Sequence, residues 1–235
     1  EAVLIDTAGR YTTHDSDRAA DRSAWFGFLS LLQRYRPQRP INGVLLTLSA
    51  SDLLQATPER MAAHAAELRQ RLDEISLRLA IEVPVYVLVT KTDLLPGFAE
   101  FFADFDQHVR SQVWGATLPP GAGVAQWRGE MDALEARLHE QMLERLGSER
   151  GSPHSAAVHA FPMQWRGLNH SALDLLQAVV TAGRGAGHST RPMLRGLYFT
   201  SATQDTSPGH RAGGTSYFVT RLLRDSLRRH YSRAQ

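Results

Sequence analysis

The sequence contains no cysteine, which excludes disulfide bonds, thiolate metal sites and cysteine nucleophiles. It has no apolar run near the roughly 20 residues that a membrane-spanning helix needs, so we expect every segment shown to be soluble. The formal net charge of +2 is too small to predict binding of nucleic acid. What remains, 235 residues of which 43% are hydrophobic, has the composition of a globular protein.

Lysine is almost absent as well. Lys91 is the single lysine among the 26 basic residues, and all the others are arginines. A lysine that persists in such a chain marks a position where a planar, forked guanidinium would serve poorly. Lys91 is therefore a candidate functional residue, with chance survival as the alternative.

Short apolar runs alternate with helical patterns over the first hundred residues. The runs that predict buried strands are Ala2–Ile5, Ile41–Ser49 and Val83–Asp93. Before the last of them, Thr57 and Pro58 have the pattern of a helix start, and apolar residues follow at spacings of three and four. This alternation predicts an α/β protein with a parallel sheet covered by helices, in which ligands bind beyond the carboxyl ends of the strands.

The rest of the chain suggests helical additions to that sheet. We expect residues 1–182 to form the α/β domain, with a helical insertion at about 97–147 and a short strand in "AVHAFPMQW" at 157–165. Residues 183–192, which are rich in glycine, form the predicted linker. A C-terminal extension, 193–235, would hold a late strand and a basic helix that either lies on anionic lipid or is simply solvated.

Two motifs fall at the carboxyl ends of predicted strands. "DTAG" places Asp6 and Gly9 at the spacing of a nucleotide-switch loop, in which the aspartate holds a magnesium-bound water and the glycine N–H meets the terminal phosphate. "TKTD" matches [Asn/Thr]-Lys-x-Asp, so Asp93 would accept hydrogen bonds from guanine and the stem of Lys91 would lie along the base or ribose. Because adenine lacks those donors, Asp93 would disfavour it. The four residues are the predicted nucleotide site, with Asp6 as an indirect magnesium ligand.

Other parts of a GTPase are missing. A phosphate loop of the form Gly-x4-Gly-Lys-[Ser/Thr] needs a lysine after a glycine, but the only lysine follows Thr90. Arg10 stands after Gly9, where many GTPases have a water-orienting glutamine. The sequence therefore assigns no catalytic residue, leaves enzyme activity open, and predicts that this chain alone binds no nucleotide tightly.

Two lesser signals carry less weight. His14, Asp15 and Asp17 lie close together and could bind a metal, although such clusters are more often solvated. Thr200–Ala202 matches a Ser-Ala motif that contacts guanine in GTPases. The strand predicted at 157–165 lies between this motif and the others, which favours an added strand over a nucleotide role.

Longer strings carry a family resemblance. "VLIDTAGRYTTHDSD", "RYRPQRPINGVLLTLSASDLL", "PVYVLVTKTDLLPGFAEFF" and "LRGLYFTSATQ" closely resemble the IcmF/TssM family, and the resemblance covers essentially all of the chain. It implies a cytoplasmic, P-loop GTPase-like domain of a bacterial inner-membrane protein of the type VI secretion system, flanked by transmembrane helices. The family's phosphate loop precedes "DTAG", so we expect a sheet that lacks its first strands and its phosphate loop.

The resemblance also implies a function. The expected role is an NTPase-like scaffold that links the inner-membrane complex, including TssL and TssJ, to baseplate components, with helical additions that present apolar and basic surfaces to these partners. The alternative is an active switch or motor that hydrolyses GTP or ATP. Either nucleotide would bind with magnesium in the full-length protein.

Overall fold

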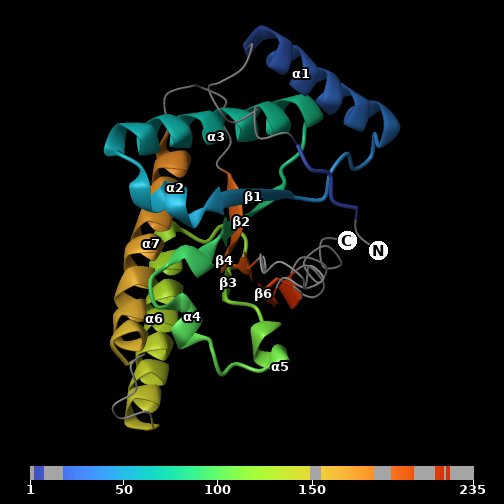
Figure 1. Ribbon diagram of the computed structural model, residues 1–235. Helices are drawn as coiled ribbons and strands as arrows, with labels where there is room; N and C mark the ends of the chain where they lie inside the picture. Colours follow the sequence, from blue (N-terminus) through green and yellow to red (C-terminus); the bar gives the residue numbers. More distant parts are fainter. Residues whose placement is uncertain are drawn as a thin grey trace. The chain divides into compact units, whose positions relative to one another are not determined.

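The computed structural model describes residues 3–7, 18–148, 155–182, 192–203, 215–219 and 221–222 (Figure 1). The chain forms two compact units. The first unit comprises residues 1–44, 57–85 and 175–193, and the second comprises 45–56, 86–174 and 194–235. Each unit is therefore assembled from segments that are distant in the sequence. No helix in the described ranges has an apolar stretch long enough to cross a membrane.

The first unit is organised by the packing of α1 (Arg18–Tyr35) on α3 (Pro58–Leu79). The predicted start of α3 is confirmed, because the Thr57 hydroxyl accepts a hydrogen bond from the Arg60 N–H at 3.3 Å. Buried residues of α1 meet those of α3 in a cluster that contains Trp25, Leu29, Ile75, Leu79 and Val83. The indole N–H of Trp25 donates to Glu74 at 2.8 Å, so its polar edge is satisfied within this apolar contact.

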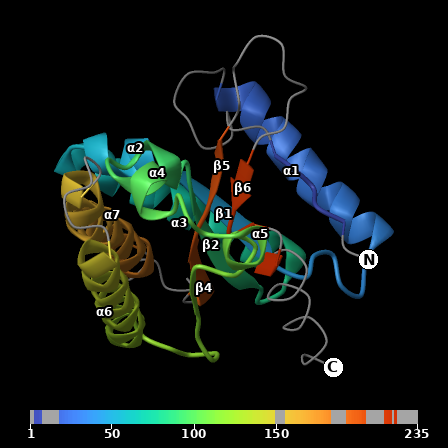
Figure 2. The same ribbon diagram turned by 60° about the horizontal axis from the view of Figure 1, so that its bottom comes forward.

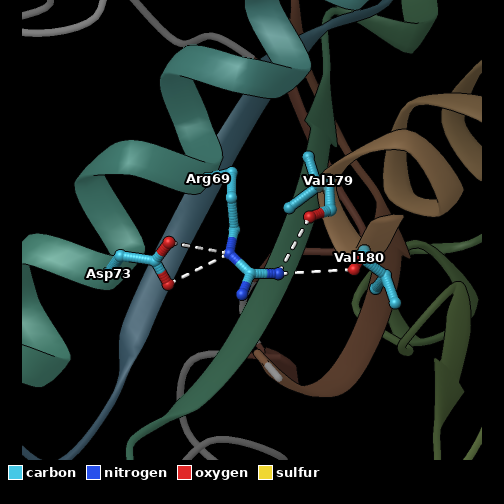
Figure 3. Close-up of polar contacts among 4 residues, drawn as sticks. All are labelled: Arg69, Asp73, Val179 and Val180. Atoms are coloured by element: carbon cyan, nitrogen blue, oxygen red, sulfur yellow. Dashed lines mark hydrogen bonds and ion pairs between the residues drawn. The ribbon is translucent and has the colours of Figure 1, made fainter. Parts of the chain in front are cut away.

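A buried arginine joins α3 to the end of α7 (Ser155–Thr181), as Figure 3 shows. Arg69 is only 4% exposed, and its Nε lies 3.0 Å from both carboxylate oxygens of Asp73. Its Nη1 donates to the carbonyl oxygens of Val179 and Val180 at 3.2 and 3.3 Å. The last carbonyls of a helix lack partners within the helix and carry partial negative charge. Arg69 therefore satisfies the end of α7 while Asp73 balances its charge.

A four-stranded sheet with the order β1-β2-β4-β3 lies mainly in the second unit. Its strands are β1 (Val44–Ser49), β2 (Pro84–Thr90), β4 (Met193–Phe199) and β3 (Gly115–Thr117). The Thr90 hydroxyl donates to the Leu48 carbonyl at 3.1 Å, and the Thr200 N–H donates to the Val89 carbonyl at 2.8 Å. The carboxyl ends of β1, β2 and β4 therefore meet at one edge, whereas β3 is antiparallel to β4. The predicted α/β class with a largely parallel sheet is confirmed.

Short elements complete the second unit beyond the sheet. They are α2 (Ala50–Gln55), the 3-10 helix η2 (Thr92–Leu94), α4 (Phe98–Phe101), α5 (Gln107–Arg110), β5 (Ser201–Thr203) and β6 (Thr215–Tyr217). Figure 2 shows β5 and β6 side by side, and they pair antiparallel. A cluster of aromatic side chains fills the interior: Phe98, Phe101, Phe102, Trp114, Phe161, Trp165 and Phe199.

The long helix α6 (Val124–Ser148) lies beside α7 in both views (Figures 1 and 2). Its predicted apolar face is buried, with exposures of 7% or less at Trp127, Met131, Leu134, Leu138 and Met142. We expected the helical insertion to offer a broad apolar surface to partners. That expectation is wrong, because Leu143 is the only large hydrophobic residue exposed between 101 and 146.

Two predicted strands are not strands. The segment Val3–Thr7 forms none, and the side chains of Val3 and Leu4 are 84% and 65% exposed. No strand among the described residues pairs with it. Its backbone therefore forms no interstrand hydrogen bonds with them, and its side chains are not buried by a neighbouring strand. Residues 157–165 belong to α7 despite Pro162. Proline disfavours the interior of a helix, but the burial of apolar residues at helical spacing outweighs that cost here. These residues are Val158, Phe161, Trp165 and Leu168.

The Arg69 contact yields the first testable prediction. Replacing Arg69 with methionine removes a buried cation and leaves Asp73 and the end of α7 without their partner, so the free energy of unfolding should fall by about 3 kcal/mol. The control is Arg128→Met, which breaks an ion pair with Asp174 whose side chains are 48% and 68% exposed. The control should cost less than about 1 kcal/mol. Urea unfolding measures both, and equal losses would contradict the buried role of Arg69.

Candidate functional site

The candidate site lies at the carboxyl edge of the sheet, in the second unit. After β2 ends at Thr90, the backbone of Lys91 adopts the left-handed conformation, with φ 59° and ψ 35°, and η2 begins at the next residue. A lysine in this conformation is strained, since its Cβ crowds the following carbonyl. The turn places the exposed side chain of Lys91 and the half-buried side chain of Asp93 on one short loop.

Backbone hydrogen bonds tie this loop to the one that follows β4. The Thr200 carbonyl accepts from the N–H of Thr92 at 3.2 Å and from its hydroxyl at 2.9 Å. Thr92 is fully buried and Thr200 is 3% exposed. Buried peptide groups that have found partners are costly to disturb, so the two loops hold a fixed geometry.

A side-chain contact completes the junction. The hydroxyl of Ser201, which is 2% exposed, donates to Oδ1 of Asp93 at 2.5 Å. A hydrogen bond to a carboxylate in a sheltered place is short and strong, so it fixes the orientation of Asp93. The remaining acceptor positions of that carboxylate stay available for donors from a ligand.

Sequence reasoning gave Ser201 too little weight. The argument against Thr200–Ala202 was a strand expected at 157–165, but that segment is helical and β4 pairs directly with β2. The sequence did contain a signal for Ser201, because the Ser-Ala pair follows an apolar run that predicts a strand. The "TKTD" motif follows such a run as well. What was missing was the pairing of the two strands.

Lys91 is the cation of this edge. Among the residues that the structure describes, it forms no ion pair. A strained backbone is kept at positions where the surrounding structure fixes it, often at ligand sites. The loop therefore offers one ammonium group and one oriented carboxylate to a ligand.

The other half of the predicted site belongs to a different unit. Asp6 is exposed, lies in the irregular segment Val3–Thr7 and belongs to the first unit. Gly9 and Arg10 fall outside the described residues, as do His14, Asp15 and Asp17 of the weighed metal cluster. That Asp6 and Gly9 share a cleft with Lys91 and Asp93 stays a prediction. No group of three or more His, Asp or Glu side chains among the described residues could hold a metal ion.

A shallow hollow of about 570 Å³ lies between α6 and α7 in the second unit. It is lined by Asp132, Glu135, Ala136, His139, Arg166 and His170. Arg166 forms an ion pair with Glu135, and this partner raises the pKa of the guanidinium above its ordinary value. Since Glu135 and Arg166 satisfy each other, the hollow is a weaker candidate than the sheet edge.

Comparisons with known proteins agree with one another. Residues 18–231 match the family described as IcmF-related N-terminal domain. The chain is 40% identical over 251 residues to "Type VI secretion system component TssM1" of Pseudomonas aeruginosa. That alignment covers 96% of this chain but 22% of the relative, so the chain spans about a fifth of the length of the protein it matches. No solved structure matches the chain.

The strain at Lys91 can be tested against an internal control. Lys91→Gly should raise the free energy of unfolding by about 0.5 to 1 kcal/mol, because glycine adopts the left-handed conformation without a Cβ clash. Ala80→Gly, at the left-handed C-cap of α3 with φ 53°, relieves the same strain away from the sheet edge and should give a similar gain. Chemical denaturation measures both, and a loss of stability for Lys91→Gly alone would refute the left-handed turn.

Proposed function

This chain belongs to the family of IcmF-related N-terminal domains, and we propose that it is the nucleotide-binding-like domain of a type VI secretion component. One observation carries the nucleotide part of this proposal. The carboxylate of Asp93, oriented by Ser201 and flanked by Lys91, stands where a sheet of this class binds its ligands. A P-loop GTPase-like fold is part of the proposal, supported by three strands whose carboxyl ends meet at this edge.

The ligand best suited to the sheet edge is a guanine nucleotide. Guanine presents N1–H and a 2-amino group, two neighbouring donors that a single carboxylate can accept together. Asp93 would accept both, Ser201 would hold that carboxylate in place, and the methylene stem of Lys91 would cover the base or ribose. Adenine offers an acceptor at N1 and no 2-amino group, so it would leave the carboxylate unpaired. We therefore propose GTP over ATP.

The phosphate end of the nucleotide would fall to other residues. We propose that Gly9 meets the terminal phosphate and that Asp6 holds magnesium through a water molecule. Such a metal ion would neutralise the charge of the phosphates, and Asp6 would only orient the water molecule bound to the metal. The sequence contains no Gly-x4-Gly-Lys-[Ser/Thr] loop, so tests of binding need the longer protein to which the family points.

The role we propose for the domain is that of a scaffold. It would link an inner-membrane complex that includes TssL and TssJ to baseplate components on the cytoplasmic side. Support comes from the family, and from the arginine that follows Gly9, which cannot act as a base. One observation favours the alternative, an active switch. Lys91 keeps a strained backbone at the proposed base site, as functional nucleotide sites do.

The base site predicts a change in nucleotide preference. In the full-length protein, Asp93→Asn should reduce the preference for GTP over ATP by about tenfold or more, because an amide cannot accept from both guanine donors. Ser201→Ala should weaken GTP binding more than ATP binding, since it frees the carboxylate to rotate.

The control for these variants is Ser216→Ala, an exposed serine of β6 in the same unit, which should change neither affinity. Titration calorimetry with each nucleotide and magnesium gives the affinities. A wild-type protein that prefers ATP, or an Asp93→Asn variant that keeps its preference for GTP, would disprove the proposed role of Asp93.

The scaffold role predicts that assembly survives loss of the metal ligand. Asp6→Ala in the full-length protein, expressed in cells, should leave the secretion complex assembled, because the proposed contacts with partners need no hydrolysis. Assembly is followed by co-purification of the complex, with protein abundance as the control for folding. If Asp6→Ala abolishes assembly while the protein stays abundant, the switch alternative replaces the scaffold.

A further inference from the structure

The end of α1, in the first unit, presents two large apolar side chains to solvent. Leu31 is 53% exposed and Tyr35 is 74% exposed, although both lie on a helix that packs on α3. Arg34 and Arg36 are exposed beside them, and the guanidinium of Arg34 lies 5.9 Å from the centre of the Tyr35 ring. We refer to Leu31, Arg34, Tyr35 and Arg36 as the α1 patch.

This patch is not needed for the packing of α1. The residues that hold α1 on α3 border the patch but do not belong to it: Trp25 is 5% exposed, Leu29 is 1% exposed, and Phe28 packs against them. Neither Leu31 nor Tyr35 lines the hollow between α6 and α7. The patch is therefore exposed surface that the packing of α1 on α3 leaves uncovered.

The charged residues that neighbour the patch in the sequence are all positive. No acidic residue occurs between Asp21 and Asp52, whereas four arginines do: Arg22, Arg34, Arg36 and Arg39. Two other arginines of this unit are balanced, Arg69 by Asp73 and Arg71 by Glu74. Within the described part of the chain, Arg34 and Arg36 form no ion pair. The patch thus combines uncompensated positive charge with exposed apolar groups.

We propose that the α1 patch binds the surface of an anionic membrane. Arginine side chains attract the phosphates of anionic headgroups, and a tyrosine and a leucine beside them suit the boundary between headgroups and acyl chains. This inference goes beyond the proposed nucleotide site and does not depend on it.

Sedimentation with lipid vesicles tests the proposal. The wild-type chain should bind vesicles that contain phosphatidylglycerol, should bind pure phosphatidylcholine vesicles far more weakly, and should be released at about 0.5 M salt. Arg34→Gln combined with Arg36→Gln should weaken binding to the anionic vesicles by about tenfold or more. Leu31→Ser combined with Tyr35→Ser should weaken it by a few fold.

Matched controls remove the same charge or apolar area elsewhere. Arg60→Gln with Arg137→Gln changes two exposed arginines, and Leu77→Ser with Leu143→Ser changes two side chains that are 69% and 64% exposed. Both control pairs should bind like the wild type. The arginine-rich segment after Phe218 is present in all variants. The ratio of their affinities for vesicles therefore measures the contribution of the patch alone. Equal binding by patch and control variants, or wild-type binding that does not depend on anionic lipid, would overturn the proposal.

A fluorescent probe locates the contact directly. The four native tryptophans are buried, with exposures of 7% or less, so Tyr35→Trp adds the only exposed indole. Its emission should shift to the blue with anionic vesicles and be quenched by brominated lipid. An unshifted and unquenched signal from bound protein would overturn the proposal.

Binding to acidic polymers is a separate test of the occupant. If the patch binds polyglutamate or DNA more tightly than vesicles, an acidic macromolecule is the occupant and the proposal is overturned.

Discussion

The candidate site depends on the peptide groups of Thr200. Its N–H donates to the carbonyl of Val89, and its carbonyl accepts two hydrogen bonds from Thr92. These bonds connect the ends of β2 and β4, so the loops that follow the two strands cannot move independently. The contact between Ser201 and Asp93 follows from that connection, because each residue is one position beyond a fixed one.

Much of the local structure could be predicted from the sequence. The start of α3 at Thr57, the strand that ends at Ser49 and the strand at Val83–Asp93 all rest on short-range patterns, and the structure agrees. The last of these strands ends earlier than predicted, at Thr90, because Thr92–Leu94 form η2. The order of the strands could not be predicted in this way, since pairing joins residues that are distant in the sequence, such as Val89 and Thr200. The contact between Ser201 and Asp93 was missed for the same reason.

The errors also have physical causes. Val3–Ile5 has the composition of a buried strand, but burial requires neighbours, and none of the described strands pairs with this segment. For residues 157–165 we expected a short strand, yet Phe161 and Trp165 are fully buried at helical spacing. In both cases tertiary contacts, or their absence, overrode the local preference. The α1 patch is the reverse case, in which apolar and basic residues remain exposed without any contact that requires them.

The central claim is that Lys91, Asp93 and Ser201 form a guanine site, and the direct measurement is the rate at which the Lys91 amine is acylated. Lys91 is the only lysine of this chain, so the modified peptide identifies it by mass spectrometry even in the full-length protein. We expect GTP with magnesium to slow acylation of Lys91 by about tenfold, and ATP to slow it much less, because the base should cover the side chain. A rate that neither nucleotide changes, or that ATP reduces more than GTP, would contradict the account.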